Sequence, residues 1–498
     1  MHDASCRVVS NPPSQVCKPV FPLRIAIQAP LPPQDAHHLL SNTQHVLEDL
    51  NDFSAHQLRL LLVDPSAPEP ANASQQAVVD SISHARDYDE NVALSVRLIP
   101  VETGTTPRSH LQPYSATLDI YYSPNQISSP STGSSLATFI AQELYKIYSE
   151  EQDQLAYLLS TAPGGYAAKG KSFTPETATE LQRQSTRAFK YAPTYHLTFS
   201  LFTPTSAPSS WDIDAALQQY MAPMLESFSS ISNFTIDTQL QLYATFAPSS
   251  RQPDYDETLK AWALRKEDLS GFINAAEWPL SPSIGKGPTI HFALYVPEQA
   301  QSPLLVQGSG ANSWLVPQWG GVVILNTSPQ VSTPLALTKE DLVPAMQTFS
   351  DQLVLLLGLP QAPASLPLRL STLARVRTAS LIFSASSTLG ALAQVYQKMP
   401  SIPVPDFVAK SVEFSLGHLQ EACDGLHDGR FQDALIHARA ADGEAEKAFF
   451  ERSMVGQVYF PDEHKVAVYL PLLGPVTVPL VMAALKELKS GIAALRRR

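Results

Sequence analysis

The residues best suited to covalent catalysis lie in one short segment of the carboxyl-terminal half. Cys423 lies between His418 and His427, five residues from the first and four from the second. A nearby imidazole can deprotonate a thiol, so this arrangement could supply the nucleophile of a cysteine hydrolase. On a helix, however, offsets of four and five residues bring such side chains together only loosely, and cysteine is often a small buried apolar residue. We therefore interpret Cys423 as a packed thiol beside surface histidines and keep the hydrolase as the less favoured alternative.

The rest of the sequence lacks the short motifs of common catalytic and cofactor sites. It contains no H-E-x-x-H, no G-x-S-x-G, no P-loop and no G-x-G-x-x-G pattern. Its three cysteines, Cys6, Cys17 and Cys423, form no C-x-x-C pair and have no His–Cys spacing of a metal centre. The sequence thus predicts no catalytic residue, no cofactor site and no metal site. A Cys6–Cys17 disulfide is conceivable, but we favour free thiols.

An aromatic and glycine-rich stretch at 313–326 is the most distinctive segment outside the carboxyl-terminal apolar run. Trp314 and Trp319 flank a proline, and Gly320 and Gly321 permit a bulge or a close backbone approach within a strand. A kinked core strand and a partner-facing edge both fit this composition, because tryptophan is favoured in cores and in binding hot spots. These four residues are therefore structural or interface candidates.

Three sequons match the acceptor pattern for N-glycosylation. They are Asn72-Ala-Ser, Asn233-Phe-Thr and Asn326-Thr-Ser. Some sequons arise by chance in a chain rich in serine and threonine. They nevertheless favour a domain on the lumenal side of a membrane.

The element around which these features are organised is the apolar run at 466–485, twenty residues without a charge. At about 1.5 Å per residue, a helix of this length spans roughly 30 Å, the hydrocarbon thickness of a bilayer. Gly474, Pro475 and Pro479 would kink it and are tolerated in a membrane helix. The basic tail at 486–498 places the carboxyl terminus in the cytosol by the positive-inside rule. The alternative is a buried terminal helix of a soluble protein.

Composition narrows the class of protein. Only 16% of the 498 residues are charged, prolines number 42, and the net charge is −12. Low charge with many proline-bearing loops suits an extracytosolic domain. Nucleic-acid binding is excluded as a function, because it needs a basic surface and the basic residues cluster only in the tail.

Strands that alternate with helices predict an α/β fold with mixed sheets and flanking helices, followed by a helical segment and one transmembrane helix. The predicted strands include 23–31, 234–246 and 314–325. The predicted division is a divergent amino terminus at 1–22, an α/β lumenal domain at 23–337 with a soft subdivision near 161–179, a mainly helical lumenal segment at 338–465, the membrane helix at 466–485 and the cytosolic tail at 486–498.

The amino terminus conflicts with this topology. Residues 1–33 contain no apolar segment of signal-peptide or membrane length. Such a chain would insert as a tail-anchored protein and leave its large domain in the cytosol. A tail-anchored cytosolic adaptor is therefore the main alternative function.

Several segments together resemble the PIG-S subunit of the glycosylphosphatidylinositol (GPI) transamidase complex, in a fungal-type form. The segments that carry the resemblance, in chain order, are Ala29-Pro30-Leu31-Pro32, Tyr191-Ala192-Pro193, the strand at 195–201, Trp319-Gly320-Gly321-Val322 closing on Asn326, the run at 353–360, Thr388-Leu389 and Tyr459-Phe460-Pro461. The resemblance extends over nearly the whole chain from about residue 24. The first membrane helix expected before Ala29 is absent, which would be explained by an altered or incomplete amino terminus.

The resemblance implies a non-catalytic subunit in the endoplasmic reticulum membrane, with a large lumenal domain. It would scaffold the complex that attaches GPI anchors to proteins and help to hold its substrates. Its partners would be the other transamidase subunits, including the cysteine-protease-like catalytic subunit. It would also contact membrane lipid and the proprotein and GPI substrates. No cofactor is implied.

Overall fold

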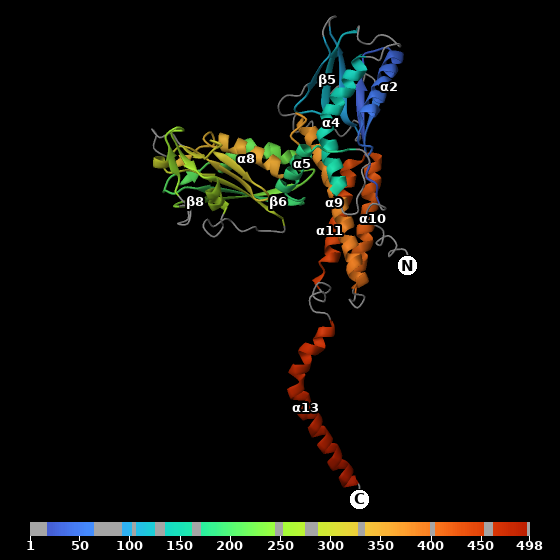
Figure 1. The fold of residues 1–498 in the computed structure, drawn as a ribbon, viewed down its shortest axis with the longest axis vertical. Coiled ribbons are helices and arrows are strands. Elements are labelled where there is room, and N and C mark those ends of the chain that lie inside the picture. The colour runs from blue at the N-terminus through green and yellow to red at the C-terminus, as the bar shows by residue number, and fades with distance from the viewer. Residues whose placement is uncertain are drawn as a thin grey trace.

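The computed structural model describes residues 17–63, 92–101, 106–124, 135–161, 171–244, 252–273, 287–326, 334–398, 404–452 and 462–495 of the 498-residue chain. Two α/β lobes attach to a helical stem, one at its end and one at its side (Figure 1). A last helix, α13 (Asp462–Leu495), lies apart from this folded body at the opposite end of the stem.

The first lobe is built on a five-stranded sheet in the order β2-β1-β3-β5-β4. Its strands are β1 (Phe21–Gln28), β2 (His56–Val63), β3 (Val92–Pro100), β4 (Arg108–Leu111) and β5 (Thr117–Tyr122). All neighbours are parallel except β4, which pairs antiparallel with β5. Alternate residues Leu23, Ile25 and Ile27 of β1 are buried in one core with the apolar faces of α2 (Pro33–Leu50) and α4 (Ser135–Thr161).

The second lobe has a five-stranded sheet in the order β13-β14-β11-β6-β8. Its strands are β6 (Thr194–Phe202), β8 (Asn233–Gln241), β11 (Thr289–Tyr295), β13 (Ser313–Val316) and β14 (Gly320–Ile324), and only β13 pairs antiparallel. Phe349 of α8 (Val343–Leu356) packs on Phe199 and Phe292, whose rings stack at 5.1 Å between centroids. The core of this lobe is therefore aromatic, and α8 covers it.

Smaller elements complete the second lobe. They are α5 (Pro175–Arg187), β7 (Ser210–Trp211), α6 (Ile213–Ala216), a π turn at Leu217–Met221, α7 (Ala222–Ser227), β9 (Asp254–Asp256), β10 (Ala261–Leu264), 3₁₀ turns at Lys266–Ile273 and Gln299–Gln301, β12 (Leu304–Val306) and β15 (Ala336–Leu337). Strands β9, β10 and β12 form a third sheet, and β7 pairs with β15.

Three long helices form the stem: α9 (Leu366–Lys398), α10 (Asp406–Asp428) and α11 (Phe431–Phe449). Gly429 ends α10 with φ of 80°, the left-handed conformation that glycine adopts without steric cost. The chain then turns back at once into α11. Small residues allow the close approach of these helices, since a Cβ at Gly425 would lie 3.1 Å from the Cβ of Ala434.

The structure confirms the α/β fold with mixed sheets, flanking helices and a carboxyl-terminal helical region. The prediction of one strand at 314–325 is wrong, because the chain reverses at Pro317–Trp319 and forms the antiparallel pair β13 and β14. Gln318 in this turn has φ of 53°. Strand β8 ends at Gln241, short of the predicted 246, and residues 245–246 lie outside the described ranges. The predicted domain division stays a prediction.

Candidate functional site

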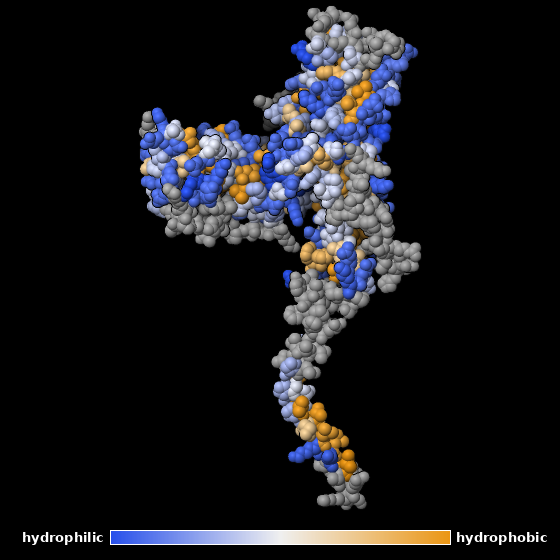
Figure 2. Space-filling view, viewed as in Figure 1, coloured by the Kyte–Doolittle hydropathy of each residue, from blue (hydrophilic) through white to orange (hydrophobic). Residues whose placement is uncertain are grey.

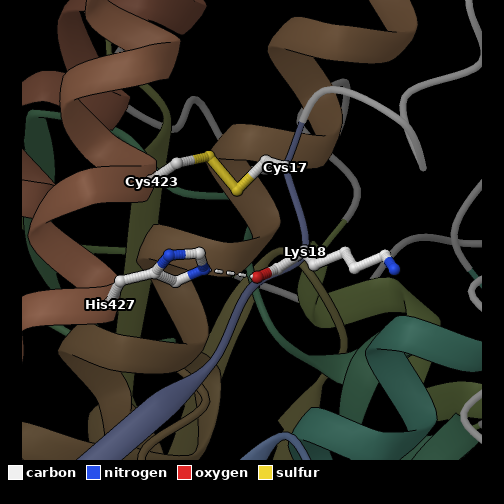
Figure 3. Close-up of a disulfide and its surroundings, with 4 residues drawn as sticks. All are labelled: Cys17, Lys18, Cys423 and His427. Carbon is white, nitrogen blue, oxygen red and sulfur yellow. Dashed lines mark hydrogen bonds between the residues drawn. A yellow bond between two sulfur atoms is a disulfide. The ribbon is translucent and has the colours of Figure 1, made fainter.

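Cys423 is covalently bonded and does not carry a free thiol. Its sulfur joins that of Cys17, with the two Cα atoms 6.0 Å apart, and both residues are buried (Figure 3). The preference for free thiols was therefore wrong, and so was the Cys6–Cys17 alternative; Cys6 lies outside the described residues. A hydrolase with Cys423 as nucleophile is excluded for this disulfide-bonded form, because only a thiolate attacks.

The two histidines near Cys423 have other partners. The Nε2 of His427 donates a hydrogen bond to the carbonyl oxygen of Lys18 at 2.7 Å, beside the disulfide (Figure 3). The Nδ1 atoms of His418 and His437 lie 3.0 Å apart, which joins α10 to α11. The segment before β1 is thus fixed to α10 by a covalent bond and a hydrogen bond. This cluster has a structural role.

A buried ion pair joins α4 and α9. Glu151 and Arg375 form two hydrogen bonds of 2.6 Å each, and the hydroxyl of Thr372 donates a third to Glu151 at 2.6 Å. Both charged side chains are almost completely buried. The pair therefore links the first lobe to the stem.

Electrostatics keep this carboxylate ionised. Burial alone would raise the pKa of Glu151, but the charge and hydrogen bonds of Arg375 outweigh it and hold that pKa well below its usual range. His56 lies 3.5 Å from the same carboxylate, and its other ring nitrogen lies 3.3 Å from the amide of Gln152. Burial raises the pKa of the neighbouring Tyr148. A carboxylate so tightly paired is a poor general base, so the cluster stabilises rather than catalyses.

A surface cavity of about 290 Å³ lies nearby, between α2, β2 and α4. Its polar side chains are largely bonded to the protein itself. The Nε2 of Gln44 donates to the carbonyl of Leu58, the Oε1 of Gln44 accepts from the N–H of Leu60, and Arg59 donates to Gln57. The cavity pairs no nucleophile with a base. Across the described ranges, no group of three or more His, Cys, Asp or Glu residues could hold a metal ion.

The aromatic and glycine-rich segment is mostly structural. A Cβ at Gly320 would lie 1.8 Å from the carbonyl oxygen of His291, and one at Gly321 would lie 1.8 Å from the Oε1 of Gln352. A side chain at 320 would therefore clash with the backbone of β11, whereas at 321 the neighbour is the end of the flexible Gln352 side chain on α8. Trp319 stacks on His291 at 5.2 Å between ring centroids.

Trp314 lies half-buried on β13, the edge strand of the sheet. Its carbonyl oxygen accepts a hydrogen bond of 3.1 Å from the amide of Gln352. Of the four candidates, Trp314 is thus the one on an edge strand. Its role in an interface stays a prediction.

The three sequons differ in accessibility. Asn233 is exposed at the start of the edge strand β8, whereas Asn72 lies outside the described residues. Asn326 is half-buried, and its side chain both accepts from the N–H of Leu304 at 2.7 Å and donates to its carbonyl at 3.0 Å. A glycan on Asn326 would be attached to the Nδ2 atom that makes the second of these bonds. Of the two described asparagines, Asn233 is the more exposed.

The predicted membrane segment is a helix inside α13, with Pro471, Pro475 and Pro479 in its interior. The hydroxyl of Thr477 donates to the carbonyl of Leu473, next to the predicted kink residue Gly474. Apolar side chains on the helix, such as Val476 and Leu480, are more than 60% exposed. Figure 2 shows hydrophobic atoms on one side of this helix, with hydrophilic residues beside them. Membrane crossing by 466–485 stays a prediction.

Among the helices described in full, α9 has the length and composition of a membrane span. Its charged Arg375 is buried against α4, and its neighbours Leu373, Ala374 and Leu381 belong to the main core. We therefore interpret α9 as a core helix of the stem.

Sequence reasoning missed the disulfide and the buried ion pair. Cysteines separated by 406 residues carry no local signal of pairing. A glutamate and an arginine separated by more than two hundred residues look like ordinary surface charges. Arg375 gave no distinct signal either, because the same helix also carries Arg369 and Arg377.

Comparison with known proteins places these features in a family. The family model described as "Phosphatidylinositol-glycan biosynthesis class S protein" matches residues 8–494. A Mus musculus protein named "GPI-anchor transamidase component PIGS" is 31% identical over 371 residues, 70% of this chain and 66% of its own length. The chain thus spans just under two thirds of that relative.

Two fungal proteins are also similar. The "GPI transamidase component PIG-S homolog" of Schizosaccharomyces pombe is 32% identical over 317 residues, 61% of this chain and 56% of its own length. The "GPI transamidase component GPI17" of Saccharomyces cerevisiae is 29% identical over 312 residues, 58% of this chain and 57% of its own length.

Proposed function

This chain belongs to the PIG-S family, and on that basis we propose that it is a non-catalytic subunit of GPI transamidase. In this role it supports the attachment of GPI anchors to proteins in the endoplasmic reticulum by scaffolding the assembly and its substrates. The names of its relatives, which call them components of the transamidase, supply the starting point for the proposal.

The observation that carries the non-catalytic role is the state of Cys423. The strongest candidate nucleophile of the sequence is buried in a disulfide, and the nearby histidines bond elsewhere. In this proposal the catalytic cysteine belongs to another chain of the complex, and the bonded state of Cys423 supports it. The partners of this subunit are the other transamidase subunits, including the cysteine-protease-like one, and membrane lipid.

A lumenal body agrees with the same disulfide. Disulfides persist in oxidising compartments such as the lumen of the endoplasmic reticulum and are rare in the cytosol. The Cys17–Cys423 bond and the exposed sequon at Asn233 thus argue against the tail-anchored cytosolic adaptor. In this topology α13 crosses the membrane at 466–485 and the basic tail at 486–498 is cytosolic.

Scaffolding requires surfaces that bind other subunits. The prolines of α13 leave backbone carbonyls that need hydrogen-bond donors, and helices of other subunits can supply them within the bilayer. On the lumenal side, Trp314 on edge strand β13 is the candidate contact. The kinked helix and the edge strand together define the surfaces to test.

A rescue experiment tests the proposal. The chain is expressed in Schizosaccharomyces pombe depleted of its own PIG-S homolog, and a GPI-anchored reporter is measured at the cell surface. We expect rescue by the unmodified chain and by the Cys423→Ala variant, together with co-purification of the catalytic subunit.

The Cys17→Ala variant separates a structural from a catalytic role of Cys423. Loss of rescue in Cys423→Ala, with a matched loss in Cys17→Ala, would indicate a requirement for the disulfide and would leave the non-catalytic role standing. Loss in Cys423→Ala alone, with Cys17→Ala active, would instead indicate a catalytic thiol and would overturn the non-catalytic role.

A further inference from the structure

The topology of the stem brings three helix ends together. Because α9, α10 and α11 run alternately down, up and down, the end of α9, the start of α10 and the end of α11 lie at the same end of the stem (Figure 1). This is the end that faces α13. The chain passes from Phe449 to Asp462 in thirteen steps, which cover at most about 45 Å when fully extended.

Apolar side chains are exposed at this end, which we call the stem tip and define as Tyr396, Val404, Phe407 and Phe450. Their exposed fractions are 47%, 40%, 49% and 65%. Beneath them, Val408 of α10 and Ala448 of α11 are buried in a small core of their own. The tip is therefore packed inside and apolar outside, and hydrophobic atoms are visible at the lower end of the stem in Figure 2.

Charged residues border the same surface. Lys398, at the end of α9, and Lys410, on the first turns of α10, are both exposed, as is Asp406 beside Phe407. Aromatic rings beside long basic side chains are typical of the boundary between water and lipid, where rings sit at the level of the headgroups and ammonium groups reach the phosphates. A dry protein interface, in contrast, is depleted of lysine at its centre.

We propose that the stem tip rests in the interfacial layer of the membrane that α13 crosses. The occupant of this surface is lipid, and the contact sets the height and tilt of the lumenal body above the bilayer. This inference rests on the proposed function, because it requires α13 to be the membrane span.

Spin labels on the full chain in phosphatidylcholine liposomes test the contact. In a Cys6→Ser background that keeps the Cys17–Cys423 disulfide, single nitroxides are attached in Phe407→Cys, Phe450→Cys, Ile436→Cys and Val478→Cys. Ile436 is the matched control, since it is 58% exposed and apolar but lies near the other end of α11. The readout is the ratio of collision rates with oxygen, which concentrates in lipid, and with a water-soluble nickel complex.

We expect the oxygen-to-nickel ratio to be highest at position 478. The ratios at 407 and 450 should exceed the ratio at 436 by at least threefold. Ratios at 407 and 450 equal to that at 436, with 478 still in lipid, would overturn the stem-tip contact and leave the span intact. Protection from both reagents at 407 and 450 would indicate a second copy on this surface and would also overturn it. A water-exposed 478 would refute the span of the proposed function itself. Equal thermal unfolding midpoints of the four variants control for folding.

Discussion

Two long helices of this protein, α9 and α13, look alike in sequence and differ in surroundings. α9 has 33 residues and α13 has 34, and both are rich in leucine and alanine. α9 is packed among α4, α10 and α11, with its Arg375 paired to Glu151, whereas α13 has exposed apolar side chains at described positions from Tyr469 to Ile492. Length and apolar composition therefore do not by themselves distinguish a core helix from a membrane span.

The difference lies in how each helix satisfies its polar groups. α9 carries arginines and threonines whose hydrogen bonds are made within the protein, as in Thr372 to Glu151 and Thr378 to Ala374. The segment at 466–485 has no charge to pair and needs only an apolar medium and partners for the carbonyls freed by its prolines. The predictions below test this contrast, starting with the largest expected effect.

Removing the buried carboxylate should strongly destabilise the body around α9. The Glu151→Ala variant leaves Arg375 buried without a counter-charge, a change that typically costs about 3–5 kcal/mol. Urea unfolding of the purified full chain in detergent, followed by tryptophan fluorescence, measures the shift in midpoint.

The exposed pair Glu180–Arg183 on α5 provides the control. Glu180→Ala should leave the midpoint nearly unchanged, because surface pairs contribute about 0–1 kcal/mol. The double variant Glu151→Leu with Arg375→Met should recover most of the loss, since neither buried charge remains. A loss in the double variant as large as in Glu151→Ala would refute the account of α9.

Removing the disulfide should have the next largest effect. Cys17→Ser opens a covalent loop with a sequence separation of 406 residues, and loss of a native disulfide typically costs about 2–5 kcal/mol. The urea midpoint of Cys17→Ser should fall, and Cys423→Ser should match it. Reducing agent should lower the urea midpoint of the unmodified chain to the same value. Different midpoints for the two variants would contradict a shared bond.

A charge in α13 should weaken membrane integration without unfolding the body. Val476→Lys places a lysine near the centre of 466–485, where charged residues cost about 2.5–3.5 kcal/mol on the insertion scale. The fraction of protein that resists carbonate extraction from microsomes should decrease. Leu488→Lys, on the same helix but beyond 485, is the control and should remain membrane-bound. Equal extraction of the two variants would argue against the span.

The contribution of Glu151 should depend on pH in a defined direction. Its pKa is lowered in the folded state from an ordinary value of 4.5, so its stabilisation is complete above that value and is lost as pH falls towards the folded pKa. The stability difference between the unmodified chain and Glu151→Gln should therefore be constant from pH 6 to 7.5 and narrow below about 4.5. A stability difference that widens in acid would mean that the pKa of Glu151 is raised on folding. That result would refute the assigned pairing of Glu151 with Arg375.

Local patterns predicted much of the fold. The alternation in 23–31 reflects which face of β1 (Phe21–Gln28) is buried, so the type and approximate limits of this strand follow from the sequence. The hairpin at 313–324 was missed because its turn contains Gln318 in a left-handed conformation, which no residue-type signal announces.

The candidate site was less predictable, because it depends on contacts between distant segments. Gly320 and Gly321 were noticed from sequence, but their neighbours His291 and Gln352 come from other elements. Cys17 and Cys423 are brought together by the path of the whole chain. Asn233 and Asn326 look equivalent as sequons, and only the bonds from Asn326 to Leu304 separate them.

Glycan mapping tests the central claim most directly, namely that α13 holds the folded body on the lumenal side of the membrane. The protein is expressed in yeast, and microsomes are treated with endoglycosidase and, separately, with protease. We predict a glycosylated body protected from protease, with one glycan lost in Asn233→Gln and none lost in Asn326→Gln. A body without glycan that protease digests in intact microsomes would place it in the cytosol and contradict the account.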